Sequence, residues 1–168
     1  RSVNFIDINN DDWDDIFTSN GKSGGQKDLL YINDKAGGFT EVFDMDLVTQ
    51  SKPSDGASFA DYNQDGHIDA IVSNWYGVID DLFLNDGNGK LMLNKNAGIA
   101  SGSYAETAVF GDYNNDGLFD IYIPTSGGNK INHLYKNLGN SKFERITGHK
   151  IIEGNKASRA ARWSDLNN

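Results

Sequence analysis

A nine-residue acidic motif that returns at nearly even intervals is the feature that most restricts the folds open to this chain. It reads DYNQDGHID at residues 61–69 and DYNNDGLFD at 112–120. An altered copy, DINNDDWDD, occupies residues 7–15, and the start of another, DLNN, occupies 165–168. The first aspartates of successive copies are 54, 51 and 53 residues apart. Self-similarity at a fixed period of this length is typical of repeat architectures.

A second landmark has the same period. Each complete motif is followed by an aliphatic and aromatic run that ends in asparagine, and these asparagines, Asn33, Asn85 and Asn137, are 52 residues apart. A turn and a further apolar residue then follow in each copy. Two independent landmarks that share one period argue against chance.

Short β-branched and aromatic runs predict four strands in each repeat. In the second repeat they fall at 58–60, just before the motif, then at 70–73, 82–84 and 91–93. No amphipathic helix of useful length is present. Four antiparallel strands in a unit of about 50 residues are the signature of a β-propeller blade. We therefore expect an all-β fold built from four-stranded meanders.

The repeats divide the chain into predicted blades at 1–54, 55–106 and 107–158, with the first strand of a fourth at 159–168. Closed propellers have about 4–8 blades. We therefore expect this array to be part of a larger propeller. Its alternative is a small protein that closes a ring, or extends a fibre, by self-association, and the sequence leaves both open.

The spacing of oxygen-bearing side chains within the motif predicts a calcium loop. Ca²⁺ takes about 6–8 oxygen ligands. Side chains at positions 1, 3 and 5 of a tight loop converge, the carbonyl of position 7 adds an oxygen, and the carboxylate at position 9 closes the set. Glycine at position 6 permits the sharp turn. Turns without an ion explain a single copy equally well, but three copies in register favour one calcium ion per repeat.

The predicted ligands follow from these positions. They are Asp7, Asn9, Asp11, Trp13 and Asp15 in the first loop; Asp61, Asn63, Asp65, His67 and Asp69 in the second; Asp112, Asn114, Asp116, Leu118 and Asp120 in the third; and Asp165 and Asn167 in the fourth. Trp13, His67 and Leu118 contribute only backbone carbonyls, and the His67 side chain is expected to be exposed and without a role.

The first loop departs from the motif at position 6, and no complete loop has the ligand that an EF-hand requires. The first loop has Asp12 in place of glycine at position 6, and aspartate tolerates the left-handed conformation better than most residues. An EF-hand is excluded because it needs a glutamate at position 12, where Thr18, Val72 and Ile123 stand in this chain.

Composition narrows the classes of function. The formal net charge is −9, whereas a nucleic-acid partner calls for a basic face, so none is expected. No apolar run approaches the ~20 residues of a membrane span, and the absence of cysteine excludes disulfides and thiolate metal sites. The three histidines share no spacing typical of zinc sites or catalytic triads, and no nucleophile motif occurs, so we expect no enzymatic activity.

The motifs carry a family resemblance. FADYNQDGHIDAIVSN at 59–74 and FGDYNNDGLFDIYIPT at 110–125, each followed by a hairpin, resemble FG-GAP/VCBS repeats, the calcium-bearing blades of integrin α-subunit-type propellers. The resemblance covers essentially the whole chain. It implies a propeller with calcium between the first two strands of each blade and a secreted or cell-surface setting, with the periplasm as an alternative. The fold does not choose among adhesion, recognition and scaffolding.

Three functions follow as hypotheses. The first is a calcium-stabilised extracellular scaffold for adhesion or for recognition of a protein or carbohydrate. The second is a lectin-like module in which Trp13, Trp75 and Tyr76 stack on sugar rings, although packing between blades is the preferred explanation for such aromatics. The third is end-to-end self-assembly into rings or fibres.

Overall fold

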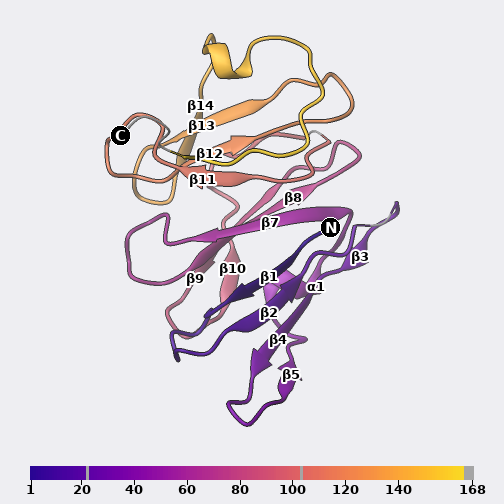
Figure 1. Ribbon diagram of the computed structural model, residues 1–168, viewed down its shortest axis with the longest axis vertical. Helices are drawn as coiled ribbons and strands as arrows, with labels where there is room; N and C mark the ends of the chain where they lie inside the picture. The colour runs from indigo at the N-terminus through magenta and orange to yellow at the C-terminus, as the bar shows by residue number, and fades with distance from the viewer. Residues whose placement is uncertain (22, 103, 165–168) are drawn as a thin grey trace.

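Three four-stranded antiparallel sheets make up most of the computed structural model, which describes residues 1–21, 23–102 and 104–164 (Figure 1). Each sheet takes its strands from one repeat in sequence order, as a meander. The first sheet contains β1 (Val3–Ile6), β2 (Asp15–Thr18), β4 (Leu29–Asn33) and β5 (Phe39–Glu41). The second contains β7 (Ser54–Ala60), β8 (Asp69–Asn74), β9 (Asp81–Asn85) and β10 (Leu91–Leu93). The third contains β11 (Val109–Gly111), β12 (Asp120–Ile123), β13 (His133–Asn137) and β14 (Phe143–Arg145).

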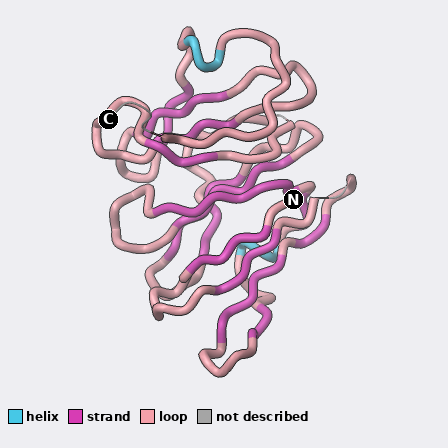
Figure 2. The backbone as a smooth tube through the Cα atoms, viewed as in Figure 1, coloured by secondary structure: helices cyan, strands magenta, loops and turns pink. Residues whose placement is uncertain are grey.

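Helix is nearly absent from the described residues, so the expected all-β class is confirmed. The helical segments there are α1 (Asp46–Thr49) and the 3₁₀ turn η1 (Lys150–Ile152), each about one turn long (Figure 2). A small additional sheet pairs β3 (Gln26–Lys27) with β6 (Ser51–Lys52). Within the part of the chain that is described, no helix has both the length and the apolar character that a membrane crossing demands.

The three sheets stack on one another along the long axis of the molecule (Figure 1). Two clusters of apolar side chains fill the spaces between them. Strand β8 shows how one strand serves both clusters. Ala70 and Val72 belong to the cluster shared with the first sheet, and Ile71 belongs to the cluster shared with the third. Successive side chains of a strand point to opposite faces, so a middle sheet needs apolar residues on both. This explains why all six residues of β8 are buried.

The segments that connect the sheets also contribute to these clusters. Met45, Leu47 and Val48, in and beside α1, pack between the first and second sheets. Ala97 and Ala105, from the connection between β10 and β11, pack between the second and third. Each connection therefore fills a gap that its own two sheets leave.

The described residues form an open stack and do not close into a ring. The first strand predicted for a fourth repeat is not formed over 159–164, where no strand is assigned. In the other repeats this strand pairs only with the strand that follows its loop, and the described residues offer 159–164 no such partner. Trp163 instead packs on the third sheet, with its ring 6.5 Å from that of Tyr122.

His133 yields a test of this packing. Its ring is 3% exposed, stacks 6.2 Å from that of Tyr135, and neither ring nitrogen has a hydrogen-bond partner among the described residues. Burial, aided by the charge of Arg145, lowers the pKa of His133 from 6.5 to about 4. The folded ring thus stays neutral where the unfolded chain takes up a proton, so stability is lost as pH falls from about 6.5 toward 4.

We predict that His133→Phe removes this loss, because phenylalanine keeps the ring but binds no proton. In denaturant melts between pH 7 and pH 4.5, the free energy of unfolding of the native chain should fall below that of the variant by up to about 1.4 kcal/mol per pH unit. Parallel pH curves for the two proteins would contradict the neutral buried ring.

Candidate metal centre

The three acidic loops, 7–15, 61–69 and 112–120, have the same backbone conformation. Each joins the first and second strands of its sheet, and each has left-handed residues at positions 4 and 6. At position 6, φ is +68° at Asp12, +89° at Gly66 and +85° at Gly117. Position 6 therefore requires a positive φ, and Asp12 meets this requirement as the sequence predicts.

The carboxylates at positions 1 and 5 hold the loop backbone in shape. In the loop 61–69, Asp61 accepts hydrogen bonds from the backbone N–H groups of Asp65 (3.0 Å) and Gly66 (2.9 Å). Asp65 accepts one from the N–H of His67 (2.9 Å) and one from the Asn63 amide (2.8 Å). The loop 112–120 repeats these four bonds at 2.8–3.1 Å. The same side chains that are predicted as ligands therefore also fix the turn of the loop.

The aspartate at position 9 begins the second strand of each sheet and is fully buried in all three. Asp15 and Asp120 use both carboxylate oxygens as acceptors for backbone N–H groups. Asp69 uses only one: Oδ1 accepts from the N–H of Asn85 at 2.9 Å, whereas the buried Oδ2 makes no hydrogen bond of normal geometry in the described chain, although the N–H of Tyr62 lies close enough to this carboxylate to lower its pKa. Burial, followed by the nearby charges of Asp65 and Asp61, raises the pKa of Asp69 to about 7.

The asparagine that ends the third strand of each sheet is a structural residue that the ligand pattern does not predict. The backbone N–H of Asn85 donates to Asp69, and its side-chain Nδ2 donates to the carbonyls of Ile68 (3.0 Å) and Ile8 (2.8 Å). Ile8 lies in the preceding loop, so this side chain joins one sheet to the next. Asn137 makes the equivalent bond to the carbonyl of Tyr62 at 2.9 Å. The 52-residue spacing of these asparagines signals their importance but not their bonds.

Neighbouring loops are also in direct contact. The Asn10 amide donates to the carbonyl of Gly66 at 3.3 Å, and the Gln64 amide donates to the carbonyl of Gly117 at 2.6 Å. The expectation that the His67 side chain is exposed and idle is wrong: it is half-buried, and its Nδ1 lies 2.8 Å from the Asn10 amide. The loops therefore lie side by side in a row.

The structure brings the predicted ligands of each loop into one turn but does not draw the carboxylates together. Among the described residues, no three histidine, aspartate or glutamate side chains lie close enough to hold a metal ion. Asp165 and Asn167, the predicted ligands of the fourth loop, lie outside the described residues.

The donor set of the loops nevertheless fits a hard divalent cation. Every predicted ligand atom is a carboxylate, amide or carbonyl oxygen, the type that Ca²⁺ prefers. Two of these atoms, Asp69 Oδ2 and Asn9 Oδ1, are buried without a hydrogen-bond partner in the described chain. A buried polar atom without a partner is costly, and a bound cation would supply the missing interaction.

Comparison with protein-family models decides the family. The model for the FG-GAP-like repeat matches the chain twice, over residues 7–72 and 61–123. Both matches begin at the first aspartate of a loop, and together they span more than half of the chain. This chain belongs to the FG-GAP/VCBS-type repeat family. The resemblance predicted from the loops of the FG-GAP chain is thus confirmed.

The family narrows the class of protein. FG-GAP repeats are typical of extracellular proteins and are generally structural or recognition modules rather than enzymes. A search of curated proteins finds no match to this chain.

Proposed function

We propose that this FG-GAP chain is a calcium-stabilised extracellular scaffold for recognition or adhesion. Its sheets would be blades of a propeller, with the boundaries predicted from the repeats, and calcium would bind in the loops between the first two strands of each blade. The observation that carries the proposal is the buried, unpartnered Oδ2 of Asp69. It lies at the end of a loop whose predicted ligand atoms are all oxygens, where that loop leads into the central sheet.

The proposed metal has a structural task. Each loop places three motif carboxylates within nine residues, and their mutual repulsion opposes the close approach of positions 1, 5 and 9. Calcium supplies the positive charge that offsets this repulsion. The carboxylates at positions 1 and 5 hold the turn of each loop. The hydrogen bonds from Asn10 and Gln64 to the neighbouring loop would help an ordered loop to order the next one. Metal binding is then coupled to folding.

The exposed row of loops is the surface that we propose for recognition. Its rigidity would come from the bound ions, because preorganised loops bind a partner at a lower entropic cost. The acidity of the chain favours a partner with cationic or hydrogen-bonding groups over a nucleic acid.

Removal of calcium is the direct test. We predict that excess chelator lowers the melting temperature by about 5–10 °C for each strongly bound ion, which corresponds to about 2.7 kcal/mol at a hundredfold excess of calcium over Kd. Magnesium should restore little of the lost melting temperature, since Mg²⁺ demands tight octahedral geometry.

Matched variants locate the effect. Asp69→Asn should reduce the calcium-dependent shift, whereas Asp86→Asn, in the exposed turn before β10, should leave it intact. Identical melting curves with calcium and with chelator would contradict the proposal.

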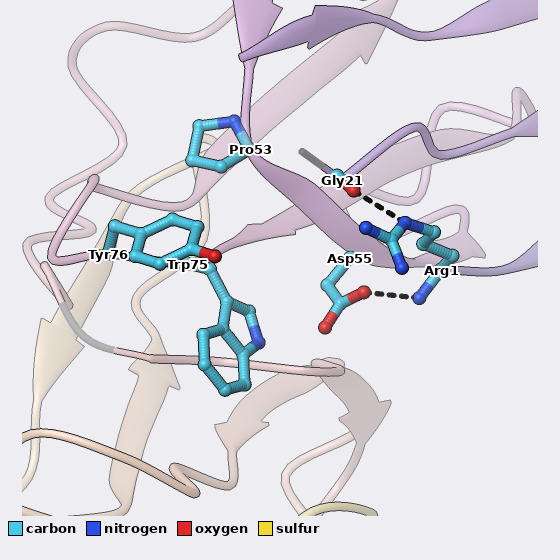
Figure 3. Close-up of a pocket in the computed structure, with 6 residues that line it drawn as sticks. All are labelled: Arg1, Gly21, Pro53, Asp55, Trp75 and Tyr76. Carbon is cyan, nitrogen blue, oxygen red and sulfur yellow. Dashed lines mark hydrogen bonds and ion pairs between the residues drawn. The ribbon is translucent and has the colours of Figure 1, made fainter. Parts of the chain in front are cut away.

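A second candidate function, carbohydrate binding, rests on one cavity. A cavity of about 180 Å³ is lined by Pro53, Trp75 and Tyr76 on one side and by Arg1 and Asp55 on the other, with Gly21 beside them (Figure 3). Tyr76 is 54% exposed and held at a left-handed φ of +57°. A sugar has an apolar ring face for an aromatic side chain and hydroxyl groups for charged partners.

Packing between side chains, the explanation preferred for these aromatics, accounts for part of this aromatic group. The Trp75 ring meets Tyr104 edge to face at 5.3 Å, and its indole nitrogen is buried. The Tyr76 ring also packs edge to face on Trp75 (5.8 Å) and Tyr104 (6.0 Å), but because it stays largely exposed it is the ring that we propose to stack on a ligand. We predict that a sugar identified on a glycan array loses at least tenfold in affinity with Tyr76→Ala but not with Phe43→Ala, an exposed aromatic elsewhere. A blank array would remove this candidate.

A further inference from the structure

The second and third loops differ in a lysine that lies outside the motif. Lys136, on β13, places its ammonium nitrogen 3.2 Å from Oδ2 of Asp116, the position-5 carboxylate of the loop 112–120. The equivalent residue of the second sheet is Leu84, on β9. No described cation forms an ion pair with Asp65, the position-5 carboxylate of the loop 61–69.

In other respects the two loops are closely matched. They share Asp, Asn, Asp, Gly and Asp at positions 1, 3, 5, 6 and 9. In both loops the side-chain oxygens at positions 1, 3 and 5 accept hydrogen bonds from the same backbone N–H groups. Left-handed backbone at positions 4 and 6 is also common to both. The lysine is thus the main difference in charge at the loop itself.

The affinity of a calcium loop depends on the charge of its ligands and on the rigidity of the site. The Lys136 ammonium cancels part of the charge of one of three carboxylates and repels an incoming cation. A second difference acts in the same direction. Oδ2 of Asp120 accepts a hydrogen bond from the N–H of Tyr113 at 3.1 Å, whereas the equivalent N–H, that of Tyr62, makes no hydrogen bond of normal geometry with the fully buried Oδ2 of Asp69.

We infer that the loop 61–69 binds calcium more tightly than the loop 112–120 and fills first, and that Lys136 sets much of the difference. This inference rests on the proposed calcium function and adds an order of binding to it. The first loop has a comparable lysine, Lys35, 3.2 Å from Asp11, but Asp12 and Asp14 add two further carboxylates there, so the order concerns the second and third loops alone.

This order of calcium binding makes the two neighbouring loops respond at different calcium concentrations. At low calcium the loop 61–69 would be ordered, and its Gln64 amide would already hold the carbonyl of Gly117 in the loop 112–120. The third loop would then respond over a higher range of calcium concentration. A scaffold built in this way changes in steps rather than in one transition.

The test follows the backbone amides of Gly66 and Gly117, one in each loop, by ¹H–¹⁵N NMR during a calcium titration of the whole chain. The Gly117 midpoint should lie at roughly fivefold higher calcium, because a partly exposed charge pair contributes up to about a factor of five. Lys136→Met should lower the Gly117 midpoint by about that factor and leave the Gly66 midpoint unchanged.

Two control variants make the outcome decisive. Lys136→Arg keeps the charge and should keep the high Gly117 midpoint, and Lys142→Met removes an exposed lysine of the same hairpin and should change neither midpoint. Coincident midpoints in the native chain, or a Gly117 midpoint that Lys136→Met does not move, would overturn the inference. If neither amide shifts at millimolar calcium, the proposed calcium function itself fails, and the order of binding falls with it.

Discussion

The rest of this structure depends on the hydrogen bonds accepted by a buried aspartate at the start of each second strand. In the central sheet, Asp69 accepts the N–H of Asn85, and the Asn85 side chain reaches the carbonyl of Ile8 in the preceding loop. One pair of residues thus joins an acidic loop, the third strand of its own sheet and the neighbouring sheet. Because isolated buried charges and carbonyls are costly, the parts of this junction stabilise one another.

The same junction explains why the loops and the apolar core cannot be separated. The sheets bury their faces against each other and against the segments that connect them, so the core forms only when neighbouring sheets are correctly spaced. Asparagine side chains bridge neighbouring sheets, the backbone N–H groups of the same asparagines donate to the buried aspartates, and those aspartates end the acidic loops. The charge concentrated in the loops is therefore part of what positions the sheets, and a cation that offsets it would act on the whole stack.

Periodic features of the sequence predict most of the fold. The acidic motif and the asparagine landmark recur with one period, and short β-branched and aromatic runs place four strands in each complete repeat. Features outside this pattern could not be predicted in the same way. The strand expected at 159–164 is not formed, because a first strand needs the partner that follows its loop.

Prediction of the site has a similar limit. The oxygen pattern predicts the loop ligands, and this stays a prediction, whereas the left-handed φ of Asp12 agrees with its place at position 6. The bonds from Asn85 to Ile8 and from Lys136 to Asp116 join residues 77 and 20 positions apart, so they depend on which elements are neighbours in space. The contact between His67 and Asn10 was missed for the same reason.

The most direct measurement compares the thermal stability of Asn85→Ala with that of Asn33→Ala. Both asparagines end the third strand of their sheets. Asn85 Nδ2 donates to the carbonyl of Ile8 in the preceding loop, whereas Asn33 Nδ2 donates to the carbonyl of Asp14 in its own loop at 3.1 Å. The account predicts that Asn85→Ala costs about 3 kcal/mol, a fall of about 6–12 °C in Tm, and that Asn33→Ala costs clearly less. Equal and small losses for the two variants would contradict it.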